Sequence, residues 1–385
     1  MSEWKKYRVC ELCSEIIDCV NKTAPISAKE TPFKMLRTSD VKEGFINLEG
    51  LNCVTEEVFQ KWTRRGELRF GDVIFTREAP LGEVGIVREA KNYFMGQRLV
   101  LYRANPNMCD SRFLMYWFLN PVNKEGLKSR GVGSTVTHLR VPECENIEII
   151  APKVETQRRI ADILSAYDDL IENNQKQIKL LEEAAQRLYK EWFVNLRFPG
   201  HENVKIIDGV PEGWRKGLLS EIVPFQRGKT ISSKQVKKGK VPVVAGGLEP
   251  AYYHDKANTK APVITVSGSG ANAGFCKLYN EDVFASDCSF ADINGTKSIF
   301  FVYCFLKANK CQLDVLQRGS AQPHVYAKDI NAMKICIPNI SVIDRFCEIV
   351  SFHYEKISML EKQCAVAIEA RDRLLPKLMS GEIEL

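Results

Sequence analysis

The stretch VITVSGSGANAGFC, residues 263–276, contains the glycine spacing of a phosphate-binding turn. A β-branched run leads into Gly268, Gly270 and Gly274, and glycines let a backbone approach a phosphate closely. A dinucleotide site, however, requires those glycines to open a helix, so that the phosphate meets the helix N-terminus. The residues that follow, FCKLYNEDVFAS, favour a strand, a turn and a second strand. We therefore predict a turn between strands here and no nucleotide site.

Other arrangements that support catalysis or metal binding are incomplete in this sequence. Cys10 and Cys13 form one CxxC pair, but no second CxxC or HxxxH pair supplies the remaining ligands of a zinc site. The triplet Glu3-Trp4-Lys5 matches the end of a nuclease carboxylate–lysine motif, yet no matching acidic partner precedes it. HExxH, GxSxG, Walker lysine and DPPY-like motifs are missing. The sequence therefore predicts no metal ion, no cofactor and no catalytic residue in this chain.

The composition is that of a globular protein with a modest positive charge. The 385 residues are 45% hydrophobic and 26% charged, with a net charge of +6, and this length favours two domains. The polar start MSEWKKYR is not a signal peptide, and no apolar run is long enough to span a bilayer. Thirteen scattered cysteines suit reduced thiols. We expect a cytoplasmic protein without a membrane partner.

One segment of the chain is strongly basic. Between Arg215 and Lys240 a single acidic residue, Glu221, stands among eight basic ones. The eight are Arg215, Lys216, Arg227, Lys229, Lys234, Lys237, Lys238 and Lys240. Such a segment either contacts nucleic-acid phosphates or forms an ordinary solvated face. Its lysines suit phosphate contacts better than base recognition.

The chain consists of two copies of one plan. GSTVTHLRVPECENIEIIAP, residues 133–152, aligns without a gap with GSAQPHVYAKDINAMKICIP, residues 319–338, at an offset of 186. Upstream, GDVIFT aligns with APVITV, and Phe94 aligns with Phe284 just before GQRL and SDCS. Repeats of this kind indicate duplicated structural units. Each copy spans about 185 residues and is predicted to be a strand-rich part followed by one long helix.

The two helical segments carry matching apolar seams. Apolar residues recur at alternating spacings of four and three, which is the pattern of a coiled coil. The predicted helix-pair interface comprises Ile160, Leu164, Tyr167, Ile171, Asn174, Ile178, Leu181 and Leu188 in the first helix, and Phe346, Val350, Ile357, Leu360 and Leu374 in the second. Asn174 is the polar residue expected to set the register. His353 and Arg371 interrupt the second seam, and we assign His353 to packing or register.

These patterns together predict an α+β fold with a pseudo-two-fold repeat. Two strand-rich domains are joined by two long helices that form an antiparallel coiled coil. The predicted boundaries are 1–153 for the first domain, 154–197 for the central helical spacer, 198–338 for the second domain and 339–385 for the C-terminal helical spacer. This arrangement holds two heads a fixed distance apart and resembles a ruler more than an active-site cleft.

At this point the sequence resembles the specificity subunits of type I restriction–modification systems along essentially its full length. The first half contains RTSDVKEGFIN, GDVIFTREAPLGEVG and GQRL, and its helix ends in LYKEWFVNLRFPGHE, followed by VPEGW. The second half contains RGKTI, GGLEPAYYH and FASD, and closes on RDRLLPKLMSGEI. Each motif is weak alone, but their order and spacing together are specific to this family.

The resemblance implies a DNA-binding protein that is not itself an enzyme. Each target-recognition domain would read one half of an asymmetric bipartite site in double-stranded DNA. The helices would set the gap and dock two modification subunits, which carry S-adenosylmethionine and methylate adenine. Restriction subunits with ATP and Mg²⁺ would add translocation and cleavage. A pseudo-two-fold protein agrees with this picture, because it places equivalent surfaces about one DNA turn apart, roughly 34–36 Å.

Base recognition needs side chains with hydrogen-bonding groups on loops or groove-facing elements. In the first domain the predicted DNA-binding residues are Arg37, Arg77, Gln97, Arg98, Ser134, Thr135 and His138. In the second domain they are Lys229, Ser267, Ser269, Ser320, Gln322 and His324. For the hydroxyl and imidazole groups, a hydrogen bond within a turn or strand is the alternative role.

Two other functions remain open at this stage. One is a nuclease or methyltransferase that works alone, against which the missing motifs argue. The other is a coiled-coil scaffold whose two heads bind protein and no DNA. Salt-dependent affinity for DNA separates the scaffold from the DNA-reading subunit, because phosphate contacts make binding fall steeply with salt.

Overall fold

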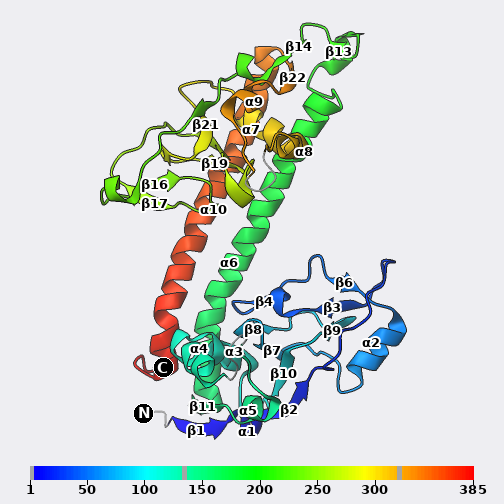
Figure 1. Ribbon diagram of the computed structural model, residues 1–385, viewed down its shortest axis with the longest axis vertical. Helices are drawn as coiled ribbons and strands as arrows, with labels where there is room; N and C mark the ends of the chain where they lie inside the picture. Colours follow the sequence, from blue (N-terminus) through cyan, green and yellow to red (C-terminus); the bar gives the residue numbers. More distant parts are fainter. Residues whose placement is uncertain (1–3, 132–136, 319–322) are drawn as a thin grey trace. The chain divides into compact units, whose positions relative to one another are not determined.

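The computed structural model describes residues 4–131, 137–318 and 323–385. The chain forms two compact units: Met1–Ile171 with Ala365–Leu385 (unit 1), and Glu172–Cys364 (unit 2). Both long helices pass from one unit into the other (Figure 1). The boundary between the two compact units therefore lies within both helices. The four domain boundaries predicted above place each helix in a segment of its own, and they stay a prediction.

Unit 1 begins with short strands and ends in helices. Its strands are β1 Lys5–Arg8, β2 Cys13–Asp18, β3 Lys34–Leu36, β4 Val41–Lys42, β5 Phe45–Ile46, β6 Asn52–Cys53, β7 Val73–Arg77, β8 Leu81–Ile86, β9 Tyr93–Met95, β10 Leu99–Ala104 and β11 Glu148–Ala151. Its helices are α1 Val9–Leu12, α2 Glu56–Thr63, α3 Ser111–Leu119, α4 Pro121–Arg130 and α5 Val141–Glu145, with a 3₁₀ turn at Thr38–Asp40. The long helix α6, Val154–Tyr189, starts in this unit.

Unit 2 follows the same order of elements. Its strands are β12 Ile206–Ile207, β13 Val210–Pro211, β14 Arg215–Leu218, β15 Gln226–Arg227, β16 Val241–Val244, β17 Tyr252–His254, β18 Val263–Ser267, β19 Cys276–Tyr279, β20 Phe284–Ala285, β21 Cys288–Asp292 and β22 Lys334–Ile337. Its helices are α7 Ile299–Ala308, α8 Lys310–Val315 and α9 Ala327–Asn331, with a π-helical turn at Lys190–Val194 and 3₁₀ turns at His201–Asn203, Leu219–Glu221, Ser233–Gln235 and Gly270–Asn272. The second long helix, α10, runs from Ile340 to Ser380.

The sheets of the two units repeat one topology. Each unit has a four-stranded sheet, β2-β10-β7-β8 in unit 1 and β15-β21-β18-β19 in unit 2. Each also has a three-stranded sheet with one parallel pair, β3 with β9 and β16 with β20. The pairs β1-β11 and β14-β22 complete the match. The internal repeat predicted from the sequence is therefore confirmed in the fold.

The central strands explain why the four-stranded sheets form where they do. Every residue of β7 (VIFTR) and of β18 (VITVS) is buried, and β-branched residues favour strands. Strand β18 runs into the Gly270–Asn272 turn and then into β19. Gly270 and Gly274 have φ of +77° and +83°, values that side chains disfavour. The prediction of a turn between strands is confirmed.

Helix α3 covers the four-stranded sheet of unit 1. Asp110 caps its N-terminus by accepting hydrogen bonds from the backbone N–H groups of Arg112 and Phe113, as N-cap aspartates do. Phe113 and Phe118 are fully buried, and the Phe118 ring lies 4.9 Å from that of Phe75 on β7. This packing makes one contiguous core that continues onto α6.

The two long helices are antiparallel within each unit. In unit 1 the start of α6 shares a core with the end of α10, through Ile160 and Leu378. In unit 2 the end of α6 shares a core with the start of α10, through Tyr189 and Phe346. The α+β fold, with two strand-rich parts joined by an antiparallel helix pair, is thus confirmed.

The predicted seam residues differ in burial. Buried are Ile160, Leu164, Ile171, Asn174, Phe346, Val350, Ile357 and Leu360; half-buried are Tyr167, Ile178, Leu181, Leu188 and Leu374. Asp168, next to Tyr167, is buried although it was not assigned to the seam. The Asn174 side chain donates a hydrogen bond to Gln363 Oε1 at 3.3 Å. A polar contact therefore lies beside the apolar seam, where register is decided.

The helices in the described parts of the chain are too short or too polar to cross a membrane. All thirteen cysteines are free thiols. Burial raises the pKa of the Cys276 and Cys304 thiols to about 12, so these two stay protonated at neutral pH.

Candidate nucleic-acid interface

In unit 1, predicted DNA-binding residues meet at one end of the four-stranded sheet. Arg77 ends β7, and its backbone N–H donates to the carbonyl oxygen of Arg98 at 3.0 Å. Glu78 forms an antiparallel bridge with His138. The backbone N–H of Leu139 donates to the Arg77 carbonyl at 3.0 Å. We call this end of the sheet, with Arg77, Glu78, Arg98 and His138, strand end 1.

Two further predicted residues, Arg37 and Gln97, flank strand end 1. The hydroxyl of Thr38 donates to the carbonyl of Ala79 at 2.8 Å, which brings the segment around Arg37 beside the end of β7. The Thr23 hydroxyl donates to Gln97 Oε1 at 3.3 Å. All five described predictions of the first domain therefore lie in one neighbourhood.

The three arginines at or beside strand end 1 differ in their exposure and in the partners of their guanidinium groups. Arg37 binds both carboxylate oxygens of Asp40, at 2.9 and 2.8 Å, and these hydrogen bonds raise the pKa of Arg37. Arg77 is only 9% exposed, and its Nε lies 3.5 Å from Asp18 Oδ1. The Arg98 side chain is 47% exposed. Arg98 is thus the arginine best placed to reach a ligand.

Unit 2 repeats this strand end with different side chains. Ser267 ends β18, and Ser269 forms an antiparallel bridge with His324. The backbone N–H of Val325 donates to the Gly268 carbonyl at 3.1 Å, as that of Leu139 does to Arg77. We call this place, with Ser267, Ser269 and His324, strand end 2.

The remaining predictions of the second domain lie near strand end 2 or outside the described residues. The Lys229 backbone N–H donates to Ala285 O at 3.0 Å, two residues before Asp287. The Ser267 hydroxyl donates to Gly246 O at 3.1 Å, so this hydroxyl is engaged within the unit. Ser134, Thr135, Ser320 and Gln322 lie outside the described residues.

The structure brings three further side chains to these places, none of which was predicted from the sequence. Glu78 faces Arg98, with Oε1 at 3.4 Å from Nε. Asp287 accepts a hydrogen bond from Ser269 Oγ at 2.5 Å. The exposed Tyr326 ring stacks on His324, with the ring centroids 6.0 Å apart. The alignment of SDCS with GQRL was the available signal for Asp287, since it places an acid in the segment where the first copy has Gln97 and Arg98.

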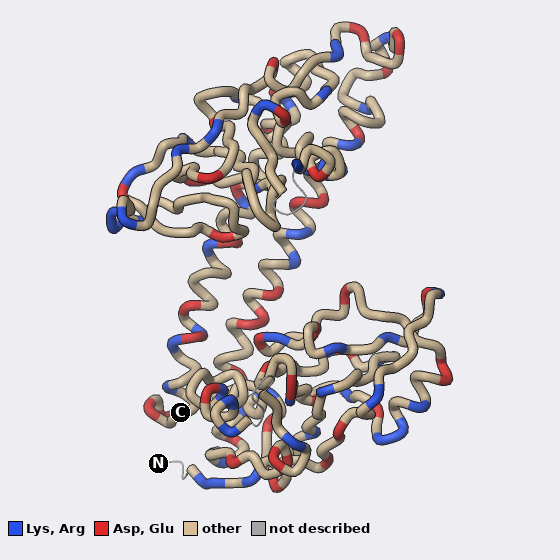
Figure 2. Tube along the Cα trace, in the orientation of Figure 1, with Lys and Arg blue, Asp and Glu red and all other residues tan. Residues whose placement is uncertain are grey.

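The basic segment of unit 2 is open to solvent. Arg227, Lys229, Lys234, Lys237, Lys238 and Lys240 are all exposed, and basic residues gather on the segment that leads into β16 (Figure 2). Arg215 differs from these residues because it forms an ion pair with Glu221. Exposed lysines of this kind are suited to phosphate contacts, which position a protein on DNA without reading its bases.

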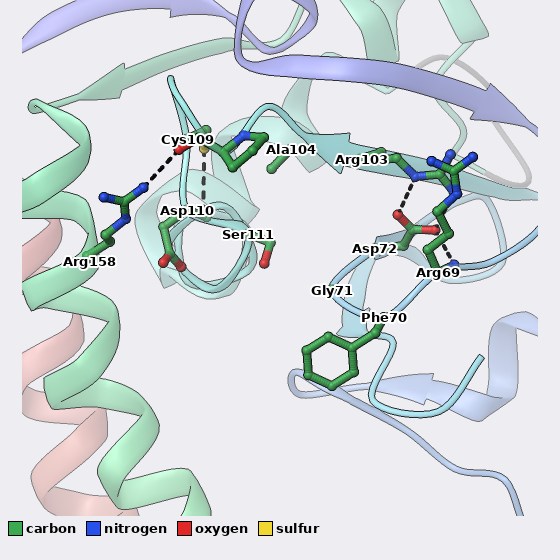
Figure 3. Close-up of a pocket in the computed structure, with 11 residues that line it drawn as sticks. Arg69, Phe70, Gly71, Asp72, Arg103, Ala104, Cys109, Asp110, Ser111 and Arg158 are labelled. Atoms are coloured by element: carbon green, nitrogen blue, oxygen red, sulfur yellow. Dashed lines mark hydrogen bonds and ion pairs between the residues drawn. The ribbon is translucent and has the colours of Figure 1, made fainter.

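A pocket of about 270 Å³ lies at the opposite end of β7 and β10 from strand end 1. Asp72 and Arg103 lie side by side in its lining (Figure 3), with Arg103 Nε donating to Asp72 Oδ1 at 2.9 Å and Nη2 to Oδ2 at 2.8 Å. Asp72 also accepts the backbone N–H of Arg69 at 2.7 Å. Phe70, at its rim, is 80% exposed. Asp72 and Arg103 neutralise each other, and Arg158 donates to the Pro106 carbonyl at 2.9 Å.

The turn that carries Gln97 and Arg98 depends on Gly96. A Cβ at this position would lie 2.6 Å from the Leu36 carbonyl oxygen, closer than backbone packing tolerates. We therefore expect Gly96→Ala to lower the free energy of unfolding by about 1–3 kcal/mol, measured by urea denaturation. Gly126→Ala is the matched control, because no atom lies within 4 Å of its Cβ in α4, and it should be stabilising by about 0.5–1 kcal/mol. Equal effects of the two changes would contradict this account of the turn.

Comparisons with known proteins agree with the repeat. The family model described as "Type I restriction modification DNA specificity domain" matches residues 1–183 and 211–370. The type I restriction enzyme MjaIX specificity subunit of Methanocaldococcus jannaschii is 28% identical over 82% of this chain and 78% of its own length. The HindI specificity subunit of Haemophilus influenzae is 22% identical over the full length of both chains.

The fold is also that of a solved protein. The crystal structure of a type I restriction–modification S subunit from M. genitalium has a TM-score of 0.67 to this chain. The two chains share 18% sequence identity, and the match covers 98% of this chain and 96% of the M. genitalium chain. The family match over most of both copies shows that the chain belongs to the family of type I restriction modification DNA specificity domains.

Proposed function

We propose that this chain is the DNA-reading subunit of a type I restriction–modification complex. Each unit reads one half of an asymmetric bipartite site in double-stranded DNA. The carrying observation is that strand ends 1 and 2 share one backbone arrangement, a bridge between the strand end and a histidine, but present different side chains. Equivalent surfaces with different hydrogen-bonding groups suit two half-sites of different sequence.

The helix pair has a separate role in the proposal. Antiparallel helices set the gap between the half-sites and dock two modification subunits. Those subunits supply S-adenosylmethionine and methylate adenine, and restriction subunits supply ATP- and Mg²⁺-dependent cleavage. The chain itself catalyses nothing. Exposed apolar residues on the helices, such as Phe352, Met359 and Val366 on α10, support a partner on this surface.

The experiment that tests the proposal is a methylome by single-molecule sequencing. The chain is co-expressed with its neighbouring modification subunit in a host that lacks other adenine methylation. We expect methyl-adenine at two unlike short half-sites separated by a constant gap. Methylation at one contiguous motif would refute the bipartite reading, and its absence from an assembled, soluble complex would favour the protein-binding scaffold.

The basic segment supplies a second prediction. Replacing Lys237 and Lys238 by alanine should weaken DNA binding to a similar extent on every sequence, because lysines here contact phosphates. The slope of log affinity against log salt should fall by about 1 per lost contact, measured by fluorescence anisotropy at several salt concentrations with the modification complex. Lys205→Ala, an exposed lysine of the same unit, is the control. An unchanged slope in the double variant would exclude these lysines from the interface.

A further inference from the structure

Strand ends 1 and 2 each carry a charged residue in the turn that leads into a central strand, and the two charges have opposite signs. In unit 1 that residue is Arg98, before β10, and in unit 2 it is Asp287, before β21. Each contacts the residue that bridges to the histidine, Glu78 or Ser269. We propose that Arg98 reads a guanine in one half-site and that Asp287 reads a cytosine in the other; this inference rests on the proposed function.

Arg98 has the geometry of a guanine-reading side chain. Glu78 contacts its Nε at 3.4 Å, and among the described residues no hydrogen bond engages its terminal nitrogens. The two terminal N–H groups are therefore available as a fork for O6 and N7 of guanine, the commonest specific contact in the major groove. The side chain is held at one nitrogen and presented at the other two.

The backbone of Arg98 adds an independent observation. Its φ is +67°, a left-handed conformation that residues other than glycine seldom adopt. Such conformations cost free energy and cluster at functional sites, where the surrounding structure imposes them. Here the Arg77 N–H bond to the Arg98 carbonyl holds the turn.

Asp287 presents the opposite chemistry. Its Oδ2 accepts the Ser269 hydroxyl at 2.5 Å, and its carbonyl accepts the Gly268 N–H at 3.3 Å. In the described part of unit 2, Oδ1 accepts no hydrogen bond. A carboxylate oxygen accepts from a base amino group, and cytosine N4 is the donor that acidic side chains recognise in the major groove. The half-sites would therefore differ because strand end 1 presents a donor and strand end 2 presents an acceptor.

Two substitutions test the inference in the complete modification complex. Arg98→Gln removes the guanidinium fork and keeps a polar, unbranched side chain at this position, and Asp287→Asn keeps the shape of the carboxylate. Each removes about one good base contact, so the preference for guanine or cytosine at a single position should fall roughly 5- to 150-fold. Arg64→Gln and Asp314→Asn, both exposed in the same units, are the controls. The readout is the single-molecule methylome, with competition binding to duplexes changed at that position.

The outcomes separate this inference from the proposed function. Relaxation at one guanine of one half-site by Arg98→Gln, and at one cytosine of the other by Asp287→Asn, supports it. If both variants keep the wild-type motif at full discrimination, or relax positions with other bases, the inference is wrong while the bipartite wild-type motif leaves the proposed function standing. If the wild-type complex itself yields no bipartite motif, the proposed function fails first and this inference with it.

Discussion

Replacing Arg371 by methionine is expected to lower the free energy of unfolding of unit 1 by about 3–5 kcal/mol. Arg371 Nη1 donates to Asp168 Oδ1 at 2.7 Å, and the Tyr116 hydroxyl donates to Asp168 Oδ2 at 2.5 Å. The Asp168 side chain is 4% exposed. Without the guanidinium, a buried carboxylate loses its counter-charge, and the desolvation cost of that charge is no longer offset. Urea denaturation followed by tryptophan fluorescence measures the loss.

The same network makes the prediction specific. Burial, and next the Asp168 carboxylate, raise the pKa of Tyr116 above its ordinary value, so the phenol remains a donor at neutral pH. Replacing the whole set together, as Asp168→Leu, Tyr116→Phe and Arg371→Met, should recover most of the stability, because apolar groups of similar volume commonly replace a buried ion pair without loss.

A matched control distinguishes this pair from ordinary surface pairs. Arg373 pairs with Glu369 on the same helix, with both side chains more than half exposed, so Arg373→Met should change stability by less than about 1 kcal/mol. A loss below 1 kcal/mol for Arg371→Met as well would show that water screens Asp168 and would refute the buried network.

Replacing Phe346 by alanine should be equally damaging in unit 2, at about 3–5 kcal/mol. Phe346 is fully buried at the start of α10. Its ring lies 5.0 Å from that of Phe193, 5.9 Å from Trp192 and 6.1 Å from Tyr189. The cavity left by truncation would remove contacts to three rings, one at the end of α6 and two in the π-helical turn that follows it, so the helix pair itself should loosen. Thermal and urea unfolding of the chain measure the effect.

Phe352 on the same helix provides the comparison for Phe346. It is 68% exposed, and Phe352→Ala should change stability by no more than about 0.5 kcal/mol. Phe346→Leu should fall between the two, because more of the side-chain volume is kept. If Phe346→Ala and Phe352→Ala cost the same, the ring cluster does not hold α10 on α6.

The framework of the fold could be predicted from the sequence because it depends on local patterns of residues. The 186-residue offset, the apolar runs GDVIFT and APVITV, and the spacing of four and three are all visible in one dimension. The spacing of the apolar residues determines whether a segment buries one face as a helix or both faces as a central strand. Strands β7 and β18 and helices α6 and α10 accordingly lie where these patterns predicted them.

The candidate site was only partly accessible, because hydrogen-bond partners come from distant parts of the chain. Arg371 was read as an interruption of the seam, and Asp168 was passed over for Tyr167, although the two charges lie 203 positions apart and compensate each other. Similarly, the sequence does not distinguish Arg77 from Arg98. In the structure Asp18 lies beside Arg77, whereas the Arg98 side chain is half exposed.

By itself the sequence determined that the chain is a duplicated, strand-rich protein with two long apolar seams, since repeat and periodicity follow from the order of residues alone. Only the tertiary structure decided which side chains are free to meet a ligand. Arg37 binds both oxygens of Asp40, and Arg77 is buried beside Asp18. Arg98 also has a carboxylate neighbour, Glu78, but its side chain is half exposed, and Asp287 keeps one carboxylate oxygen without a hydrogen bond among the described residues. The reason is physical: a charged group finds its partner through space, and the distance through space is set by the packing of the sheets.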